Sequence, residues 1–246
     1  MVPTFTPPGS RSTPAILALY VKVGACALAV GADVRRIVVA EELRDGRAFV
    51  DALLAADQLV AFAALVELAA LVVAAVLFLR FQVVAHRNLP ALGDAEPRDG
   101  VTAGVAAWFV PVLNLFRPLR VVGDLWRAGE RDARLPTLLR VWWAMWVIAL
   151  LAVLAAWTLL GDAADVGDRQ RIDGLRAGAS VLSAIAAALA IAVVVRVSAR
   201  QEERAAATGA PRSARPTVES DGLPRRSEGG LAVIREDELD RPDRSR

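Results

Sequence analysis

The stretch Trp108-Phe-Val-Pro-Val-Leu-Asn-Leu-Phe-Arg-Pro-Leu-Arg120 stands near the middle of this 246-residue sequence. It is too polar for an ordinary transmembrane helix and too apolar for an ordinary loop. The apolar segment 101–116, which leads into it, contains Pro111 and Asn114 and is shorter than the roughly 20 residues that a membrane-crossing helix needs. We therefore expect a re-entrant or interfacial segment, which is tolerated where protein covers the irregular backbone.

An amphipathic helix is predicted from Pro118, because proline suits the first turn of a helix. The apolar face of this helix consists of Leu119, Val122, Leu125 and Trp126. The polar face consists of Arg120, Asp124, Arg127 and Arg131. Such a helix fits the membrane interface, and the alternative is a helix packed on the ends of the spans. The hairpin predicted over 101–131 thus dips its apolar limb into the leaflet and lays its amphipathic limb on the surface. Asn114 is placed to cap the second limb.

Four long hydrophobic runs flank this hairpin, two before it and two after it. The predicted transmembrane spans are about 15–31, 58–79, 141–160 and 175–195. A helix over the second of them would cover about 33 Å, enough to cross the hydrocarbon core. A cleaved signal peptide is the alternative for the first run, but Lys22 in its middle and the three later spans favour an uncleaved helix. The predicted fold class is all-α, a polytopic membrane protein with four transmembrane helices.

The remaining segments are predicted from their composition. An arm over 1–14, with four prolines, and a cytoplasmic tail over 199–246, rich in charges of both signs, are expected to be disordered around a membrane domain at 15–198. The charged connection 32–57 is expected to form two short helices near the membrane surface, separated at Gly46.

Composition argues against several classes of function. Cys26 and His86 are the only cysteine and histidine, so neither a disulfide framework, a Cys/His metal cluster nor a Ser–His–Asp triad can be assembled within the chain. No phosphate-binding glycine loop occurs. We expect no enzyme and no cofactor. Most arginines flank hydrophobic runs, so orientation in a bilayer, and not nucleic acid, accounts for the basic character.

The distribution of basic residues predicts the orientation. With four spans, fifteen Arg and Lys residues flank the spans on the side of the termini and seven on the other side. The positive-inside rule then places both termini in the cytoplasm. Arginine far outnumbers lysine, and alanine is abundant, which is typical of GC-rich bacteria. We expect a bacterial plasma membrane protein.

Three blocks of residues resemble a known family of bacterial membrane proteins. They are Arg87-Asn88 with Leu92-Gly93, then Trp108-Phe-Val-Pro111 with Asn114-Leu-Phe-Arg117-Pro118 and Leu125-Trp126-Arg127, and last Trp142-Trp143 with Trp146. The chain resembles domain of unknown function 4328 over about residues 15–198. Phe116 and Leu119 stand where such proteins often carry Trp and Tyr. The resemblance implies a multi-span architecture and no particular activity.

Two charged residues lie inside predicted spans, Lys22 in the first and Glu67 in the second. On insertion scales a charge near a helix centre costs about 2.5–3.5 kcal/mol, so each needs an explanation. Lys22 can snorkel toward the cytoplasm, and Glu67 can be protonated or face a polar groove. The alternative is that they pair across adjacent antiparallel helices. The sequence leaves this open.

Function is predicted only as a class. The main hypothesis is a membrane-embedded scaffold or interaction protein, in contact with the lipid bilayer and anionic headgroups, with protein partners at its tail or self-association through its spans. The alternative is a small transporter or channel subunit that uses Glu67 and Lys22. The candidate interaction residues are Arg87, Asn88, Trp108, Pro111, Asn114, Arg117, Pro118, Arg120, Trp126 and Arg127.

Overall fold

The structure, a computed structural model, describes residues 3–93, 100–128, 134–160 and 166–213. The described residues are almost entirely helical: α1 (Gly9–Arg44), α2 (Val50–Arg87), η1 (Leu89–Leu92), α3 (Val101–Ala106), α4 (Pro111–Asn114), α5 (Arg117–Arg127), α6 (Thr137–Leu160) and α7 (Val166–Thr208). Four of them, α1, α2, α6 and α7, are long and apolar enough to cross a membrane. The predicted all-α fold with four membrane-spanning helices is confirmed.

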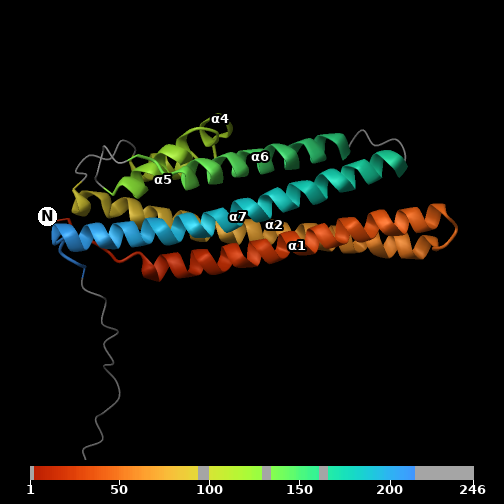
Figure 1. Cartoon of the computed structure of the whole chain (residues 1–246), viewed down its shortest axis with the longest axis horizontal. Helices are drawn as coiled ribbons and strands as arrows, with labels where there is room; N and C mark the ends of the chain where they lie inside the picture. Colours follow the sequence, from red (N-terminus) through yellow and green to blue (C-terminus); the bar gives the residue numbers. More distant parts are fainter. Residues whose placement is uncertain (1–2, 94–99, 129–133, 161–165, 214–246) are drawn as a thin grey trace, which may run out of the picture. The chain divides into compact units, whose positions relative to one another are not determined.

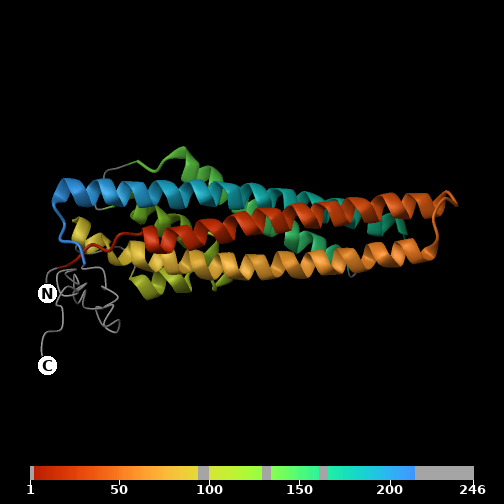
Figure 2. The same ribbon diagram turned by 90° about the horizontal axis from the view of Figure 1, so that it is seen from below.

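The four long helices run alongside one another (Figures 1 and 2). Helix α1 packs against both α2 and α7, and α7 also packs against α6, so the order across the bundle is α2, α1, α7, α6. The short helix α5 contacts α2, α6 and α7. We call the end with α5 and the N-terminal arm the terminal end, and the end with the α1–α2 connection the loop end.

Small side chains line the helix contacts, and large apolar side chains cover the outside. The buried residues of α1, α2 and α7 are mostly alanines, including Ala18, Ala25, Ala29, Ala63, Ala70, Ala74, Ala186, Ala187 and Ala190. Alanine lets helix backbones approach closely. In a bilayer, where lipid tails are as apolar as the side chains, helices associate mainly through such close packing. Exposed Leu, Val and Phe side chains, such as Phe62, Leu65 and Leu68, face outward. An apolar exterior of this extent suits a bilayer and not water.

The connection predicted over 32–57 is much shorter than expected. Helix α1 continues to Arg44 and α2 begins at Val50, so the charged residues lie on extensions of the spans and not on separate surface helices. The predicted break at Gly46 is present, since this residue has a φ of +72° that favours glycine. Among these charged residues, Asp33, Arg36 and Asp57 form ion pairs between helices, which lets α1 and α2 continue through them.

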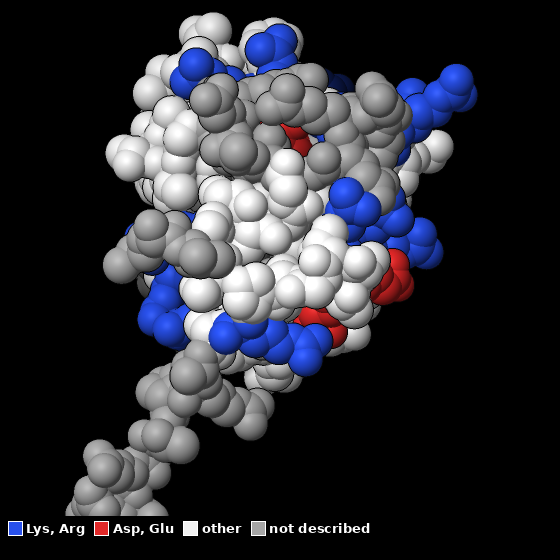
Figure 3. Space-filling model, turned by 90° about the vertical axis from the view of Figure 1, so that its left-hand side faces the viewer, with Lys and Arg blue, Asp and Glu red and all other residues white. Residues whose placement is uncertain are grey.

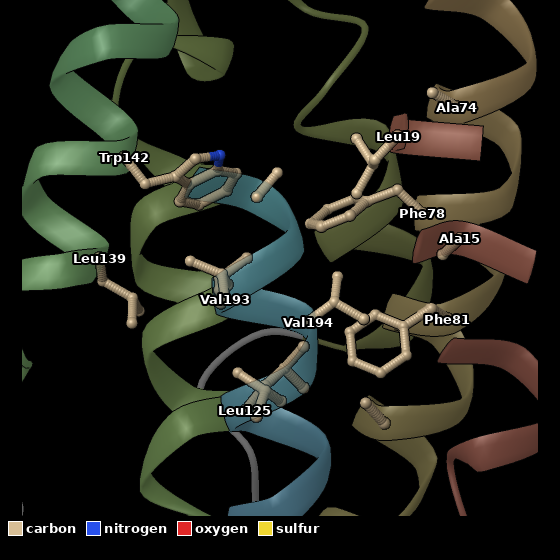
Figure 4. Close-up of a cluster of buried hydrophobic side chains, with 14 of the residues drawn as sticks. Ala15, Leu19, Ala74, Phe78, Phe81, Leu125, Leu139, Trp142, Val193 and Val194 are labelled. Atoms are coloured by element: carbon tan, nitrogen blue, oxygen red, sulfur yellow. The ribbon is translucent and has the colours of Figure 1, made fainter. Parts of the chain in front are cut away.

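The largest hydrophobic cluster lies toward the terminal end, where α5 fills the space between α2, α6 and α7 (Figure 4). Phe78 and Phe81 of α2, Leu125 of α5, Trp142 of α6 and Val194 of α7 are all buried in it. The rings of Phe78 and Trp142 lie 6.0 Å apart, so α2 and α6 meet here through aromatic side chains.

The apolar face of the amphipathic helix α5 is covered by protein. Val122 and Leu125 of α5 are buried in the main cluster, and Asp124, predicted on the polar face, is also buried. The predicted alternative, a helix packed on the ends of the spans, describes these contacts of α5, and the location of the hairpin at a membrane interface stays a prediction. An apolar stripe looks the same whether lipid or protein covers it.

Two segments predicted to be disordered are ordered in part. Phe5 is buried with Leu92, Ala128 and Ala205, and its amide donates to the Pro211 carbonyl at 2.8 Å. The arm is therefore held to the bundle at Phe5 and Thr6, and residues 1–2 lie outside the described residues. Helix α7 continues to Thr208, so the predicted tail starts too early. Residues 214–246 lie outside the described residues.

Candidate functional site: a polar seam between three helices

The two charged residues inside the spans are in contact. Lys22 Nζ donates to Glu67 Oε1 at 2.7 Å, and the Lys22 side chain is only 6% exposed. Two further groups complete this central cluster: Lys22 also donates to Cys26 Sγ at 3.1 Å, and Ser180 of α7 donates to Glu67 Oε2 at 3.1 Å. The cluster therefore joins α1, α2 and α7 by polar contacts. It is one place in the spans where hydrogen bonds hold three helices together.

A second group of charges, the loop-end cluster, joins the same three helices nearer the loop end. It consists of Asp33 and Arg36 of α1, Asp57 of α2, and Asp173 and Arg176 of α7. Arg36 donates from Nε to Asp57 and from Nη1 to Asp173, and Arg176 Nη2 lies 3.6 Å from Asp33 Oδ1. We call the central and loop-end clusters together the polar seam.

The pairing between α1 and α7 is reciprocal, and its geometry follows from the sequence. Both helices carry an aspartate followed three residues later by an arginine, Asp33 with Arg36 and Asp173 with Arg176. Because α1 and α7 run in opposite directions, the aspartate of each helix meets the arginine of the other. The sequence analysis missed these residues, and the repeated Asp-x-x-Arg spacing is the signal that could have revealed them.

Asp33 has the weakest contacts in the seam. Its residue is 1% exposed, and its Oδ1 accepts no hydrogen bond among the described residues. The 3.6 Å contact with Arg176 is an ion pair by distance but too long for a good hydrogen bond. A buried carboxylate oxygen without a hydrogen bond is rare and calls for an explanation.

The tryptophan of the central motif is a packing residue. Trp108 follows α3 and lies against Phe78 of α2 and against Trp143 and Trp146 of α6, with ring centroids 5.6–6.2 Å apart. Its Nε1 donates to Gln82 Oε1 at 2.9 Å, and Gln82 Nε2 donates to the Gly104 carbonyl. The motif therefore fixes the α3–α4 segment to α2 and α6.

Asn88 is also a structural residue, and it ties the N-terminal arm to the end of the bundle. Its side chain exchanges two hydrogen bonds with the backbone of Thr6, at 2.8 and 2.9 Å, and donates to Gln201 Oε1 at 3.2 Å. Gln201 of α7 in turn donates to the Ala85 carbonyl. The arm, α2 and α7 are joined here through buried amides.

The other motif residues divide between the surface and the interior. Arg87 and Arg120 are exposed, Arg117 is half-buried, and Pro118 is buried in the first turn of α5. Trp126 is half-buried against the main cluster. Pro111 begins α4.

Asn114 does not cap α5. It ends α4, its Oδ1 has no hydrogen-bond partner among the described residues, and the residue at the N-cap of α5 is Phe116. The predicted cap is wrong because α4 and the turn at Leu115 separate Asn114 from the first turn of α5. The spacing between Asn114 and Arg117 in the sequence does not reveal that a turn interrupts the helix at this point.

The terminal end of the bundle is rich in basic side chains. Figure 3 looks onto it and shows Lys and Arg around an uncharged centre. Arg127 donates to Asp124 Oδ1 at 2.8 Å and, with Arg200, Glu203 and Arg204, lines a cavity of about 180 Å³. This surface is mixed in charge, with an excess of arginine over glutamate around the cavity.

Comparison with known proteins identifies the family. The sequence profile of a domain of unknown function, DUF4328, matches residues 44–199, which is more than half of the chain. The chain belongs to the DUF4328 family. No curated protein and no solved structure matches it. The description of DUF4328 assigns no activity, so the chain is a multi-pass membrane protein of unknown biochemical activity.

The DUF4328 match divides the polar seam. Asp57, Glu67, Asp173, Arg176 and Ser180 lie within the matched residues, whereas the α1 side chains that pair with them lie before residue 44. The resemblance stated from the sequence motifs began at residue 15, so the profile match is shorter at the N-terminal side. Each ion pair between α1 and another helix thus joins a residue inside the match to one outside it.

The described residues offer no grouping suited to a metal ion. Among residues 3–93, 100–128, 134–160 and 166–213, no three His, Cys, Asp or Glu side chains gather as a metal site. The seam instead combines carboxylates with guanidinium and ammonium groups. Such a set can hold ion pairs and exchange protons.

Proposed function

We propose that this DUF4328 protein is a membrane-embedded scaffold whose terminal end binds partners at the cytoplasmic face of a bacterial plasma membrane. The observation that carries the proposal is the arrangement of charges. Within the central cluster Lys22 and Glu67 are hydrogen-bonded to each other, whereas the terminal end presents exposed arginines such as Arg87 and Arg120. Paired charges hold helices together, and exposed charges of one sign attract ligands. We propose no enzymatic activity.

The α3–α4 segment supports the same proposal. Phe109, Val110, Val112 and Phe116 are exposed apolar side chains on a segment that projects from the bundle beside α5 (Figure 1). In a bilayer this surface would enter the cytoplasmic leaflet, with the arginines nearby at the headgroups. Each juxtamembrane arginine would add on the order of 1 kcal/mol of attraction to anionic lipid, weakened by salt.

The orientation is part of the proposal and has its own test. In a Cys26→Ala background, single cysteines at Asp45 and Ser213 are labelled in intact cells with a reagent that does not cross the membrane. We expect labelling at Asp45 in the α1–α2 connection and none at Ser213. Labelling at Ser213 from outside would show that the end of α7 lies outside the cell, which would contradict the proposal of a cytoplasmic scaffold.

Scaffolding is tested by affinity purification of crosslinked complexes from membranes, with full-length protein and with a chain shortened by residues 214–246. This boundary leaves Ser213, whose amide donates to the Phe5 carbonyl, in place. A matched variant carries Arg87→Gln and Arg120→Gln with the tail intact. If the full-length protein captures a set of proteins that the shortened chain or the arginine variant does not capture, the scaffold is supported. If the full-length protein, both variants and a membrane protein of unrelated sequence all capture the same proteins, the scaffold is contradicted.

A second candidate function is a small transporter or channel subunit, and the polar seam favours it. Ionisable residues inside membrane helices commonly mark ion or proton pathways. The seam extends along α1 from Lys22 to Arg36, about 21 Å at 1.5 Å per residue. Proteoliposomes loaded with a pH-sensitive dye test this reading. Proton flux that is lost on Glu67→Gln supports it, and flux no greater than in empty liposomes excludes proton conduction.

A further inference from the structure

The loop-end cluster carries an imbalance of charge. It holds three carboxyl groups, those of Asp33, Asp57 and Asp173, and two guanidinium groups, those of Arg36 and Arg176. With every group ionised, the cluster has one excess negative charge. Because the side chains of Asp33 and Asp173 are only 2% and 6% exposed, water screens this charge poorly.

The contacts decide which carboxyl carries the excess. Arg36 is hydrogen-bonded to both Asp57 and Asp173, and the Asp57 side chain is 45% exposed and reaches water. Asp33 has neither advantage, because its Oδ1 is buried without a hydrogen bond and Arg176 lies 3.6 Å away. Burial favours the neutral form of a carboxyl group most where the fewest donors stabilise the anion.

The surrounding charges do not remove the imbalance. The ionisable groups that interact with Asp33 are Arg36 on its own helix, Glu67 on α2, and Asp173 and Arg176 on α7. Glu67 is already paired with Lys22 and adds no net positive charge. Two guanidinium groups in the cluster would repel a metal cation. The ligand whose size and charge fit this site is a proton.

We propose that the loop-end cluster is a proton-binding site and that Asp33 carries the proton. The bound proton removes the excess charge, and a neutral carboxyl group loses less free energy than a carboxylate when it is buried with few hydrogen bonds. The site lies between α1, α2 and α7 at the loop end, two helical turns along α1 from Cys26 of the central cluster. Ser180, one turn from Arg176 on α7, bonds to Glu67, so the seam joins this site to the middle of the spans.

Infrared difference spectroscopy of the full-length protein in lipid nanodiscs detects such a proton as the C=O absorption of a protonated carboxyl group. Exposed carboxyls titrate near pH 4, so a band that grows between about pH 8 and about pH 5 belongs to a desolvated one. We expect this band in the wild type and in the exposed control Asp45→Asn, and its loss in Asp33→Asn. The band should shift in D₂O, as an O–H group requires.

A second variant keeps the test decisive if Asp33→Asn does not fold. Arg176→Gln removes the guanidinium that lies 3.6 Å from Asp33 Oδ1, so the midpoint of the band should move to higher pH by roughly one unit or more. Retention of the band in folded Asp33→Asn, or an unchanged midpoint in Arg176→Gln, would overturn the proposal.

Discussion

Replacing Glu67 with glutamine should destabilise the protein more than replacing Lys22 with methionine, and the double replacement should restore most of the loss. In Glu67→Gln, the buried Lys22 ammonium keeps the contact with Cys26 Sγ and an amide oxygen as acceptor, but it loses its counter-charge. In Lys22→Met, Glu67 keeps the hydrogen bond from Ser180. Breaking a buried ion pair by removing one partner costs about 3–5 kcal/mol because an uncompensated charge remains.

The cost of each single variant has an upper bound, since the remaining group can neutralise itself. At about 1.36 kcal/mol per pH unit, removing the proton from a lysine at pH 7 costs about 4.6 kcal/mol, and adding one to a glutamate costs about 3.7 kcal/mol. We therefore expect Glu67→Gln to be the worse variant by up to about 1 kcal/mol. Because the double variant is expected to restore most of the loss, the coupling energy should be at least as large as the cost of the milder single variant, about 3 kcal/mol or more, which is at the upper end for residues in contact.

The assay is reversible unfolding in mixed detergent and lipid micelles, followed by helical ellipticity, for the wild type, both single variants and the double variant. The matched control is the exposed ion pair between Arg47 and Asp45, 2.7 Å apart in the α1–α2 connection. The cycle Arg47→Met with Asp45→Asn should show coupling close to zero. If the Lys22 and Glu67 effects simply add, the two side chains do not stabilise each other and the central cluster has another role.

Three further predictions concern the terminal end. A spin label at Val110 should be accessible to oxygen and shielded from an aqueous quencher, whereas one at Val122, inside the main cluster, should be shielded from both; equal aqueous quenching at the two sites would contradict this. Trp108→Ala should cost about 3–5 kcal/mol in the same unfolding assay, because it empties a packed aromatic site, while Trp157→Ala, whose ring is 71% exposed, should cost little; similar losses would mean that Trp108 is not a core residue. Asn88→Ala removes three hydrogen bonds worth about 1 kcal/mol each and should speed amide hydrogen exchange in the N-terminal arm, and unchanged exchange would show that Phe5 alone holds the arm.

The sequence by itself determined the fold class and the number of spans. An apolar run as long as 58–79, with Glu67 as its one charged residue, is expected to form a buried or membrane-spanning helix, because hydrocarbon offers no partners to backbone polar groups. The break at Gly46 was also predictable, since glycine readily adopts positive φ. The motif around Trp108 was sufficient to indicate the family, and the profile match to DUF4328 bears this out.

Where helices end was decided by contacts that a sequence window does not contain. Charges at Asp33, Arg36 and Asp57 suggested that the spans stopped, yet α1 and α2 continue through them because the charges pair across helices. The N-terminal arm was predicted to be disordered because it has four prolines and few large apolar side chains. The burial of Phe5 depends on Leu92 and Ala205, far away in the chain.

Only the tertiary structure decided which polar residues meet. Depth along a helix is readable from residue number at about 1.5 Å per residue, so Lys22 and Glu67 could be placed at compatible depths. Which helices are neighbours, and which way each one is rotated, depends on packing summed over the whole bundle. Ser180 therefore joined Glu67, and Asp173 joined Arg36, across 113 and 137 residues of chain. The same summed packing turned the apolar face of α5 toward the protein and buried Asp33 Oδ1 where no described residue donates a hydrogen bond to it.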